Sequence, residues 1–134
     1  MTDFFDKTDL SRKDAESIVS ETLNNCDDGE LYLENSKSET IVLDDNKIKS
    51  SSYSSDLRYG LRAITGEIVA YSHSNDISKN SLRQSANNLQ STLKSKKGTY
   101  NHSISKTNEK FYSDVNPIEE KSLNSKLELL KEVN

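Results

Sequence analysis

Three stretches of the chain space their apolar residues as an amphipathic helix does. They cover residues 11–25, residues 79–94 and the residues from 117 onward. Their apolar stripes are Ala15, Ile18, Val19 and Leu23; Leu82, Ala86, Leu89 and Leu93; and Leu123, Leu127 and Leu130. A residue that can cap a helix lies at or just before the start of each stretch, namely Ser11, Ser78 and Asn116. We therefore expect three helices, each with one face on a core.

Residues 30–73, between the first two predicted helices, alternate apolar and polar positions as half-buried strands do. Short apolar runs are separated by Ser-, Asn- and Asp-rich segments, and Asp45-Asn46 has the composition of a two-residue hairpin turn. This pattern predicts an α+β fold: a helix, an antiparallel sheet of four to five short strands, and a second helix.

The domain organisation follows from these elements. We expect a flexible N-terminus over residues 1–10 and a folded α+β domain over residues 11–94. Residues 95–134 are expected to form a polar loop and a final helix. No stop signal follows the last apolar stripe before Asn134, which favours a truncated helix leading into a missing C-terminal part.

Composition and charge narrow the classes of function. Hydrophobic residues make up 31% of the chain and charged residues 30%, so the core is expected to be small. The net charge of −4 disfavours a nucleic-acid partner. The nearest approach to a basic cluster, Lys94, Lys96 and Lys97, is expected at a helix end, where lysines complement the helix dipole. No run is long enough to span a membrane, and the first ten residues do not resemble a secretory signal. We expect a cytoplasmic location.

The residues that carry most enzyme chemistry are sparse. His73 and His102 do not form a helical zinc-binding pair, and Cys26 is the only cysteine. No serine lies in a Gly-x-Ser-x-Gly motif. We therefore predict no catalytic residue, metal ligand or cofactor site in this chain, and expect the chain alone to be inactive.

One group of residues suggests a contact surface. In the predicted strand register, Arg58, Gly60 and Arg62 share one face, and Tyr71 lies on the neighbouring strand. Arginine binds carboxylates and carbonyls, tyrosine offers a ring and a hydroxyl, and glycine allows close approach of a second backbone. These four residues are candidates for contact with an extended peptide or another domain. The alternative is an ordinary solvated sheet face.

An ordered set of motifs resembles the start of the TldD/PmbA metallopeptidase family, and the TldD branch more than the PmbA branch. The motifs are Asp28-Gly29-Glu30-Leu31-Tyr32-Leu33-Glu34, Leu43-Asp44-Asp45-Asn46-Lys47-Ile48-Lys49, the segment from Gly60 to Ser72, Asp76-Ile77-Ser78 and Asn116-Pro117. The set covers most of the chain in order.

The resemblance implies an N-terminal domain with a scaffold and substrate-channel role in a zinc-dependent peptidase that cleaves unfolded or flexible peptides. It further implies a heterodimer with a PmbA-type partner subunit, and metal ligands in a His-Glu-x-x-x-His helix and a later segment, both of which this sequence lacks. A stand-alone, non-catalytic protein-interaction module is the alternative.

Overall fold

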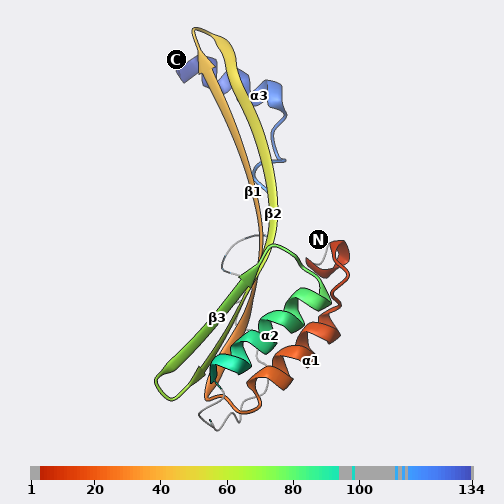
Figure 1. The fold of residues 1–134 in the computed structure, drawn as a ribbon. Helices are drawn as coiled ribbons and strands as arrows, with labels where there is room; N and C mark the ends of the chain where they lie inside the picture. Colours follow the sequence, from red (N-terminus) through yellow and green to blue (C-terminus); the bar gives the residue numbers. More distant parts are fainter. Residues whose placement is uncertain (1–3, 94–97, 99–110, 112, 114, 134) are drawn as a thin grey trace. The chain divides into compact units, whose positions relative to one another are not determined.

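The computed structural model describes residues 4–93, 98, 111, 113 and 115–133 (Figure 1). Its elements are a short 3₁₀ helix η1 (Phe4–Lys7), α1 (Arg12–Leu23), β1 (Asp28–Asp44), β2 (Lys47–Thr65), β3 (Ile68–Ser74), α2 (Lys79–Leu93) and α3 (Leu123–Val133). The chain divides into two compact units. The helix-covered unit comprises Met1–Asn35 and Asp56–Glu109, and the hairpin unit comprises Ser36–Ser55 and Lys110–Asn134.

The helices α1 and α2 begin where the sequence predicts, because serine side chains cap them. Ser11 Oγ accepts a hydrogen bond from the backbone N–H of Asp14 (3.0 Å) and donates one to that residue's carboxylate (2.8 Å). Ser78 Oγ accepts from the N–H of Ser81 (3.1 Å). Each serine therefore satisfies a backbone donor that the first helical turn leaves open.

The sheet corrects our expectation of four to five short strands. It has three antiparallel strands in the order β1-β2-β3. Two predicted pairs of short strands are in fact two continuous strands of 17 and 19 residues. We read the Ser-rich segments around residues 35–39 and 50–56 as breaks. No glycine or proline occurs between Glu30 and Tyr59, however, and the backbone stays extended through both segments.

Two tight turns connect the strands. Asp45 and Asn46 both have positive φ angles (48° and 59°), as the predicted two-residue hairpin turn between β1 and β2 requires. Gly66, at φ 59°, opens the turn between β2 and β3. The Gly66 N–H donates to Asp27 Oδ2 (2.6 Å), which ties this turn to the start of β1.

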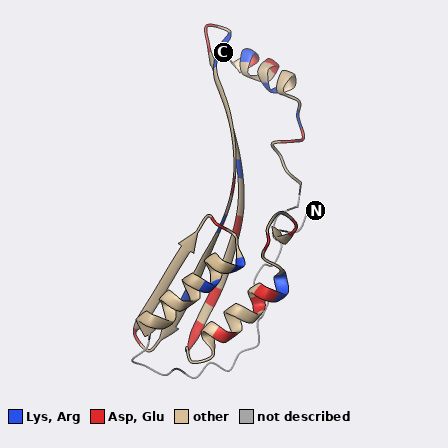
Figure 2. Cartoon of the chain, turned by 45° about the vertical axis from the view of Figure 1, so that its right-hand side comes forward, with Lys and Arg blue, Asp and Glu red and all other residues tan. Residues whose placement is uncertain are grey.

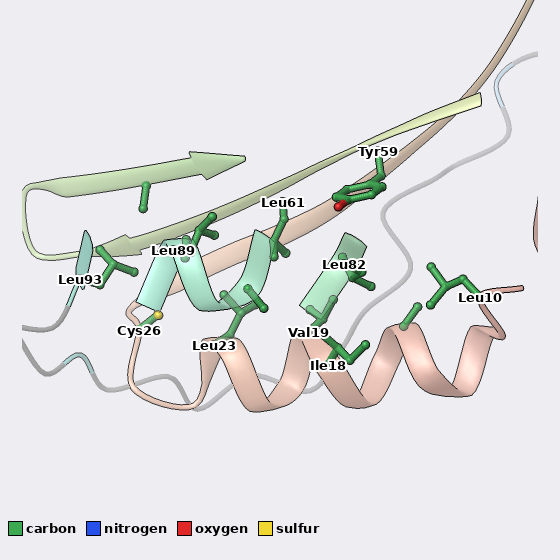
Figure 3. Packing of buried hydrophobic residues seen from close by; sticks show 14 of the residues in the cluster. Leu10, Ile18, Val19, Leu23, Cys26, Tyr59, Leu61, Leu82, Leu89 and Leu93 are labelled. Atoms are coloured by element: carbon green, nitrogen blue, oxygen red, sulfur yellow. The ribbon is translucent and has the colours of Figure 1, made fainter. Parts of the chain in front are cut away.

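The core of the helix-covered unit lies between the sheet and the two helices. In Figure 1, α1 and α2 lie side by side over one face of the sheet, and contacts join α1 to α2 and α2 to β3. Figure 3 shows Tyr59 and Leu61 of β2 on the side of the sheet that faces the helices. The fully buried large side chains are Leu10, Leu23, Tyr59, Leu61, Thr65, Leu82 and Leu89.

A network of hydroxyl groups crosses this largely apolar layer. The buried Tyr59 hydroxyl lies 2.9 Å from Ser81 Oγ and 2.8 Å from Ser85 Oγ. Ser72 Oγ of β3 donates to Ser85 Oγ (2.9 Å). Burial of a polar group is costly unless it is hydrogen-bonded, so these mutual contacts allow the hydroxyls to lie inside. The network fastens α2 to both β2 and β3.

The hairpin unit has a different construction. It contains the parts of β1 and β2 nearest their connecting turn, together with α3, and none of its described residues is buried. Lys37 Nζ binds Glu119 Oε1 at 2.8 Å. Lys126 Nζ binds the Glu39 carboxylate and the carbonyl oxygen of Ile118. The contacts described here between α3, the segment before it and the strands are therefore charged and polar.

The last helix begins later than predicted. We expected it to start at Pro117 with Asn116 as its cap, but α3 starts at Leu123. Asn116 instead closes a turn, since its carbonyl accepts from the N–H of Glu119 (3.1 Å) and its Oδ1 from that of Ile118 (3.1 Å). Ser122 Oγ accepts from the N–H of Ser125 (3.2 Å) and caps the helix. Most of the loop expected over residues 95–115 lies outside the described residues.

Candidate functional site

The outer face of the sheet, opposite the helices, brings the four predicted residues together. In the β2–β3 register, Gly60 pairs with His73 and Arg62 pairs with Tyr71. Neighbouring residues in a strand point to opposite faces. Because Tyr59, Leu61 and Ala63 are buried against the helices, Arg58, Gly60, Arg62 and Tyr71 share the exposed face. We call this surface the outer face.

Both arginines of the outer face are engaged with acids of β1. Arg62 Nη2 lies 2.9 Å from Glu30 Oε1, and its Nε donates to the same oxygen at 3.0 Å. Arg58 Nη2 binds Glu34 Oε1. Each pair joins two neighbouring strands, and each leaves more than a third of its arginine side chain exposed. The guanidinium groups are thus held in place while remaining within reach of a ligand.

Tyr32 extends the pair formed by Arg58 and Glu34. Its hydroxyl donates to Glu34 Oε2 at 3.1 Å. The hydrogen bond from Arg58 lowers the pKa of Glu34 below its ordinary value. The hydrogen bond to Glu34 raises the pKa of Tyr32, because loss of the phenolic proton would place two negative charges side by side. At neutral pH the group therefore holds one ion pair and one neutral phenol.

On the outer face, the ring of Tyr71 lies over the backbone of Gly60. A Cβ atom added at Gly60 would lie 2.6 Å from Tyr71 Oη and 3.0 Å from Tyr71 Cε2. An aromatic ring thus covers the backbone of a strand glycine, an arrangement that stabilises sheets. We had expected Gly60 to leave room for a second backbone, but the Tyr71 ring fills that room. An approaching chain would have to move the ring or lie against it.

A shallow hollow of about 350 Å³ lies around Gly60 and the Tyr71 ring. Its lining consists of Tyr32, Glu34, Arg58, Tyr59, Gly60, Tyr71 and His73. The rings of Tyr71 and His73 stack at a centroid distance of 5.8 Å and an interplanar angle of 26°. The hollow therefore combines aromatic surface with a fixed ion pair. It does not include Arg62, which lies on the same face.

Sequence reasoning missed three residues of this hollow: Tyr32, Glu34 and His73. A signal for them was present. Glu30, Tyr32 and Glu34 alternate on the polar face of β1, and His73 follows Tyr71 at the same two-residue spacing. We did not predict which polar faces of neighbouring strands would lie beside each other, and this pairing is what brings the acids to the arginines.

The described residues contain no cluster of three or more His, Cys, Asp and Glu side chains that could hold a metal ion. Cys26 is buried, with Sγ 3.6 Å from the carbonyl oxygen of Thr22. His73 belongs to the aromatic stack, and His102 lies outside the described part of the chain. The described residues therefore offer no set of ligands that fits a catalytic metal.

The charged residues are spread over the surface. Figure 2 shows acidic and basic segments on α1, on α3 and along the two long strands, whereas α2 carries basic residues only and β3 carries no charged residue. Of the helices that the structure describes, none combines the length and the apolar character that a membrane span requires. The outer face therefore stands out for its aromatic residues and paired charges rather than for a single sign of charge.

Comparison with known proteins places this fold in a family. Residues 29–93 match the family described as PmbA/TldA metallopeptidase domain 1. The "Metalloprotease TldD homolog" of Buchnera aphidicola from Acyrthosiphon pisum is 37% identical over 109 residues, which cover 81% of this chain and 23% of that protein. The proteins of the same name from Haemophilus influenzae and from Buchnera aphidicola of Schizaphis graminum are 31% and 27% identical, over 79% and 95% of this chain.

The matched residues 29–93 include all of β3 and α2, most of β1, and the whole outer face. The chain spans about a quarter of the length of the relatives it matches, 23% to 27%. The ordered strand motifs that resembled this family lie mainly within the matched segment. The chain belongs to the TldD/PmbA family of metallopeptidases and corresponds to its N-terminal domain.

Proposed function

We propose that this chain serves as a scaffold and substrate-channel domain of a TldD-type metallopeptidase, with the outer face in contact with the peptide substrate. The observation that carries the proposal is the position of this face within residues 29–93, which match the first domain of the family. The face is exposed and holds two fixed arginines beside aromatic rings. Arginine and tyrosine are among the residue types most enriched at binding hot spots.

The chemistry itself belongs, in this proposal, to the part of the full-length protein beyond this domain. The matched relatives are about four times as long as the segment they share with this chain, and their names describe metalloproteases. We propose zinc as the metal, unfolded or flexible peptides as substrates, a PmbA-type subunit as partner, and the cytoplasm as location. In this proposal the domain positions the substrate and the rest of the protein, and it supplies no metal ligand.

The test is cleavage of a flexible peptide by the full-length protein with its partner, comparing wild type with Arg62→Ala. Loss of a charge-assisted hydrogen bond to substrate weakens binding about ten- to a hundredfold. We expect peptide turnover to fall within this range while the melting temperature stays nearly constant, since Arg62 is not a core residue.

Arg83→Ala is the matched control. Arg83 is an exposed arginine of the same unit, but it lies on α2, in the helical layer. We expect this variant to leave turnover unchanged. Equal turnover in the wild-type and Arg62→Ala proteins, with equal melting curves, would contradict the proposal that the outer face contacts the substrate. A family member without peptidase activity when full-length would favour an interaction module instead.

A further inference from the structure

The hollow around Gly60 has a preference that follows from its charges. Its one acid, Glu34, is bound by Arg58 and by the Tyr32 hydroxyl. A cationic side chain entering the hollow would meet a carboxylate that is already neutralised and a guanidinium that repels it. An anionic side chain would have to compete with Glu34 for Arg58 and would lie beside the Glu34 carboxylate. The paired charges therefore favour an uncharged side chain over either charged class.

The surface available to an uncharged side chain is largely aromatic. Tyr71, which is 63% exposed, stacks on His73, and Tyr32 is also mostly exposed. The Arg58 side chain is 56% exposed while Glu34 holds its guanidinium. A guanidinium plane and aromatic rings each stack favourably on another ring. An aromatic side chain thus gains contacts here that an aliphatic one of similar size does not.

The size of the hollow also indicates its occupant. At about 350 Å³, it lies near the lower limit of the ~300–1,000 Å³ typical of ligand pockets, and it is open to solvent. A space of this kind accommodates one side chain of an extended segment rather than a whole folded ligand.

We propose that the hollow lined by Tyr32, Arg58, Gly60, Tyr71 and His73 binds an aromatic side chain of an extended peptide. The choice of a peptide rests on the proposed function, and the aromatic preference rests on the lining of the hollow itself. The aromatic residue stacks between the Arg58 guanidinium and the aromatic rings, while the neighbouring peptide backbone lies along the outer face.

The experiment measures binding of three labelled Gly/Ser-rich peptides to the full chain by fluorescence anisotropy. The peptides differ only at a central residue, which is Phe, Leu or Lys. We expect the Phe peptide to bind about three- to tenfold more tightly than the Leu peptide, the range expected from ring stacking and a cation–π contact. The Lys peptide should bind most weakly.

Two variants test the assigned contacts, and one serves as a control. Arg58→Lys keeps the positive charge but removes the planar guanidinium, so the preference for Phe over Leu should shrink toward one. Tyr71→Ala should weaken binding of the Phe peptide to the level of the Leu peptide. Val69→Ala removes an exposed side chain from the same strand outside the hollow and should leave the preference for Phe over Leu unchanged. Thermal melts verify that all three variants fold.

Equal affinities of the Phe and Leu peptides, or an unchanged preference in both Arg58→Lys and Tyr71→Ala, would overturn the inference. These results are separable from failure of the proposed function. If Arg62→Ala lowers turnover while Phe and Leu bind equally, the outer face contacts substrate without an aromatic subsite. If Phe is preferred while both Arg62→Ala and Tyr71→Ala leave turnover intact, the hollow binds an aromatic segment outside the substrate route.

Discussion

The strands β1 and β2 each contribute to two units of very different construction. In the helix-covered unit they carry apolar residues at every second position, and α1 and α2 bury that side (Figure 3). In the hairpin unit the same strands carry mainly Ser and Lys, and none of the described residues there is buried. A continuous strand therefore does not imply a continuous core. What differs is the side chains, and hence how each unit is stabilised.

Truncation of the core should give the largest effect. Leu61 and Leu82 are completely buried, on β2 and α2 respectively. Replacement of either by Ala removes apolar contacts and leaves a cavity, so we expect a loss of about 2–5 kcal/mol in the free energy of unfolding. Urea unfolding followed by circular dichroism measures this loss.

The matched control for these substitutions is Leu123→Ala in α3, where the side chain is 47% exposed. A surface substitution of this kind costs within about 0.5 kcal/mol. If Leu123→Ala destabilised the chain as much as Leu82→Ala, the hairpin unit would possess a core of its own and the contrast between the units would fail.

Removal of one buried hydroxyl should have an intermediate effect. In Tyr59→Phe the ring stays in the core, but Ser81 and Ser85 lose a shared hydrogen-bond partner. A buried group left without its partner costs about 1–3 kcal/mol, and we expect a destabilisation in this range. Tyr53→Phe, at an exposed tyrosine of the hairpin unit, provides the comparison and should be nearly silent. Equal unfolding midpoints for the two variants would show that the network contributes little.

The acid sensitivity of the helix-covered unit should trace in part to Asp14. The hydrogen bonds from Lys79 and from Ser11 hold the pKa of Asp14 below its ordinary value. Since the folded-state pKa is the lower one, the stabilisation is complete above the unfolded pKa of about 4 and is lost as the pH falls through the folded value.

The Asp14→Asn variant should therefore be less stable than wild type at pH 7, and the difference should narrow as the pH falls below about 4. Urea midpoints measured across this range test it. Glu16→Gln, which removes a carboxylate from the same helix but leaves the pair of Asp14 and Lys79 intact, should not reproduce this narrowing. A difference that stays constant with pH would mean that the pair does not contribute through its charge.

The smallest effect is expected from the ion pair of Lys37 and Glu119 in the hairpin unit. Glu119 is largely exposed, and exposed ion pairs contribute about 0–1 kcal/mol. Glu119→Gln should therefore reduce hydrogen-exchange protection of α3 only slightly and leave the helix-covered unit unchanged. Complete loss of α3 protection would indicate that this single pair holds the helix to the hairpin.

The sequence was most informative where periodicity and capping agree. The stripes of α1 and α2, their serine caps and the turn at Asp45-Asn46 were all predictable, because each depends on residues close together in the chain. The number of strands was not predictable from the sequence. Ser-rich segments without glycine or proline are compatible with either a loop or an exposed strand, and pairing with a neighbouring strand decides between them.

The outer face also combines features that depend on one strand alone with features that depend on contacts between strands. Alternation along β2 placed Arg58, Gly60 and Arg62 together, since that depends on one strand alone. The ion pairs with Glu30 and Glu34, and the position of the Tyr71 ring over Gly60, depend on how neighbouring strands lie against one another. Local pattern therefore located the surface, whereas contacts across strands determine its chemistry.

The hydroxyl network around Tyr59 also bears on the uniqueness of the fold. The apolar stripe of α2 repeats with the helical turn, so a shift of α2 by one turn along the sheet would still bury leucine against leucine. Such a shift would separate Ser81 and Ser85 from Tyr59, and Ser85 from Ser72, leaving the buried hydroxyls of Tyr59 and Ser85 without these partners. The network thus favours one alignment of α2 on the sheet over shifted alignments that would bury the leucines equally well.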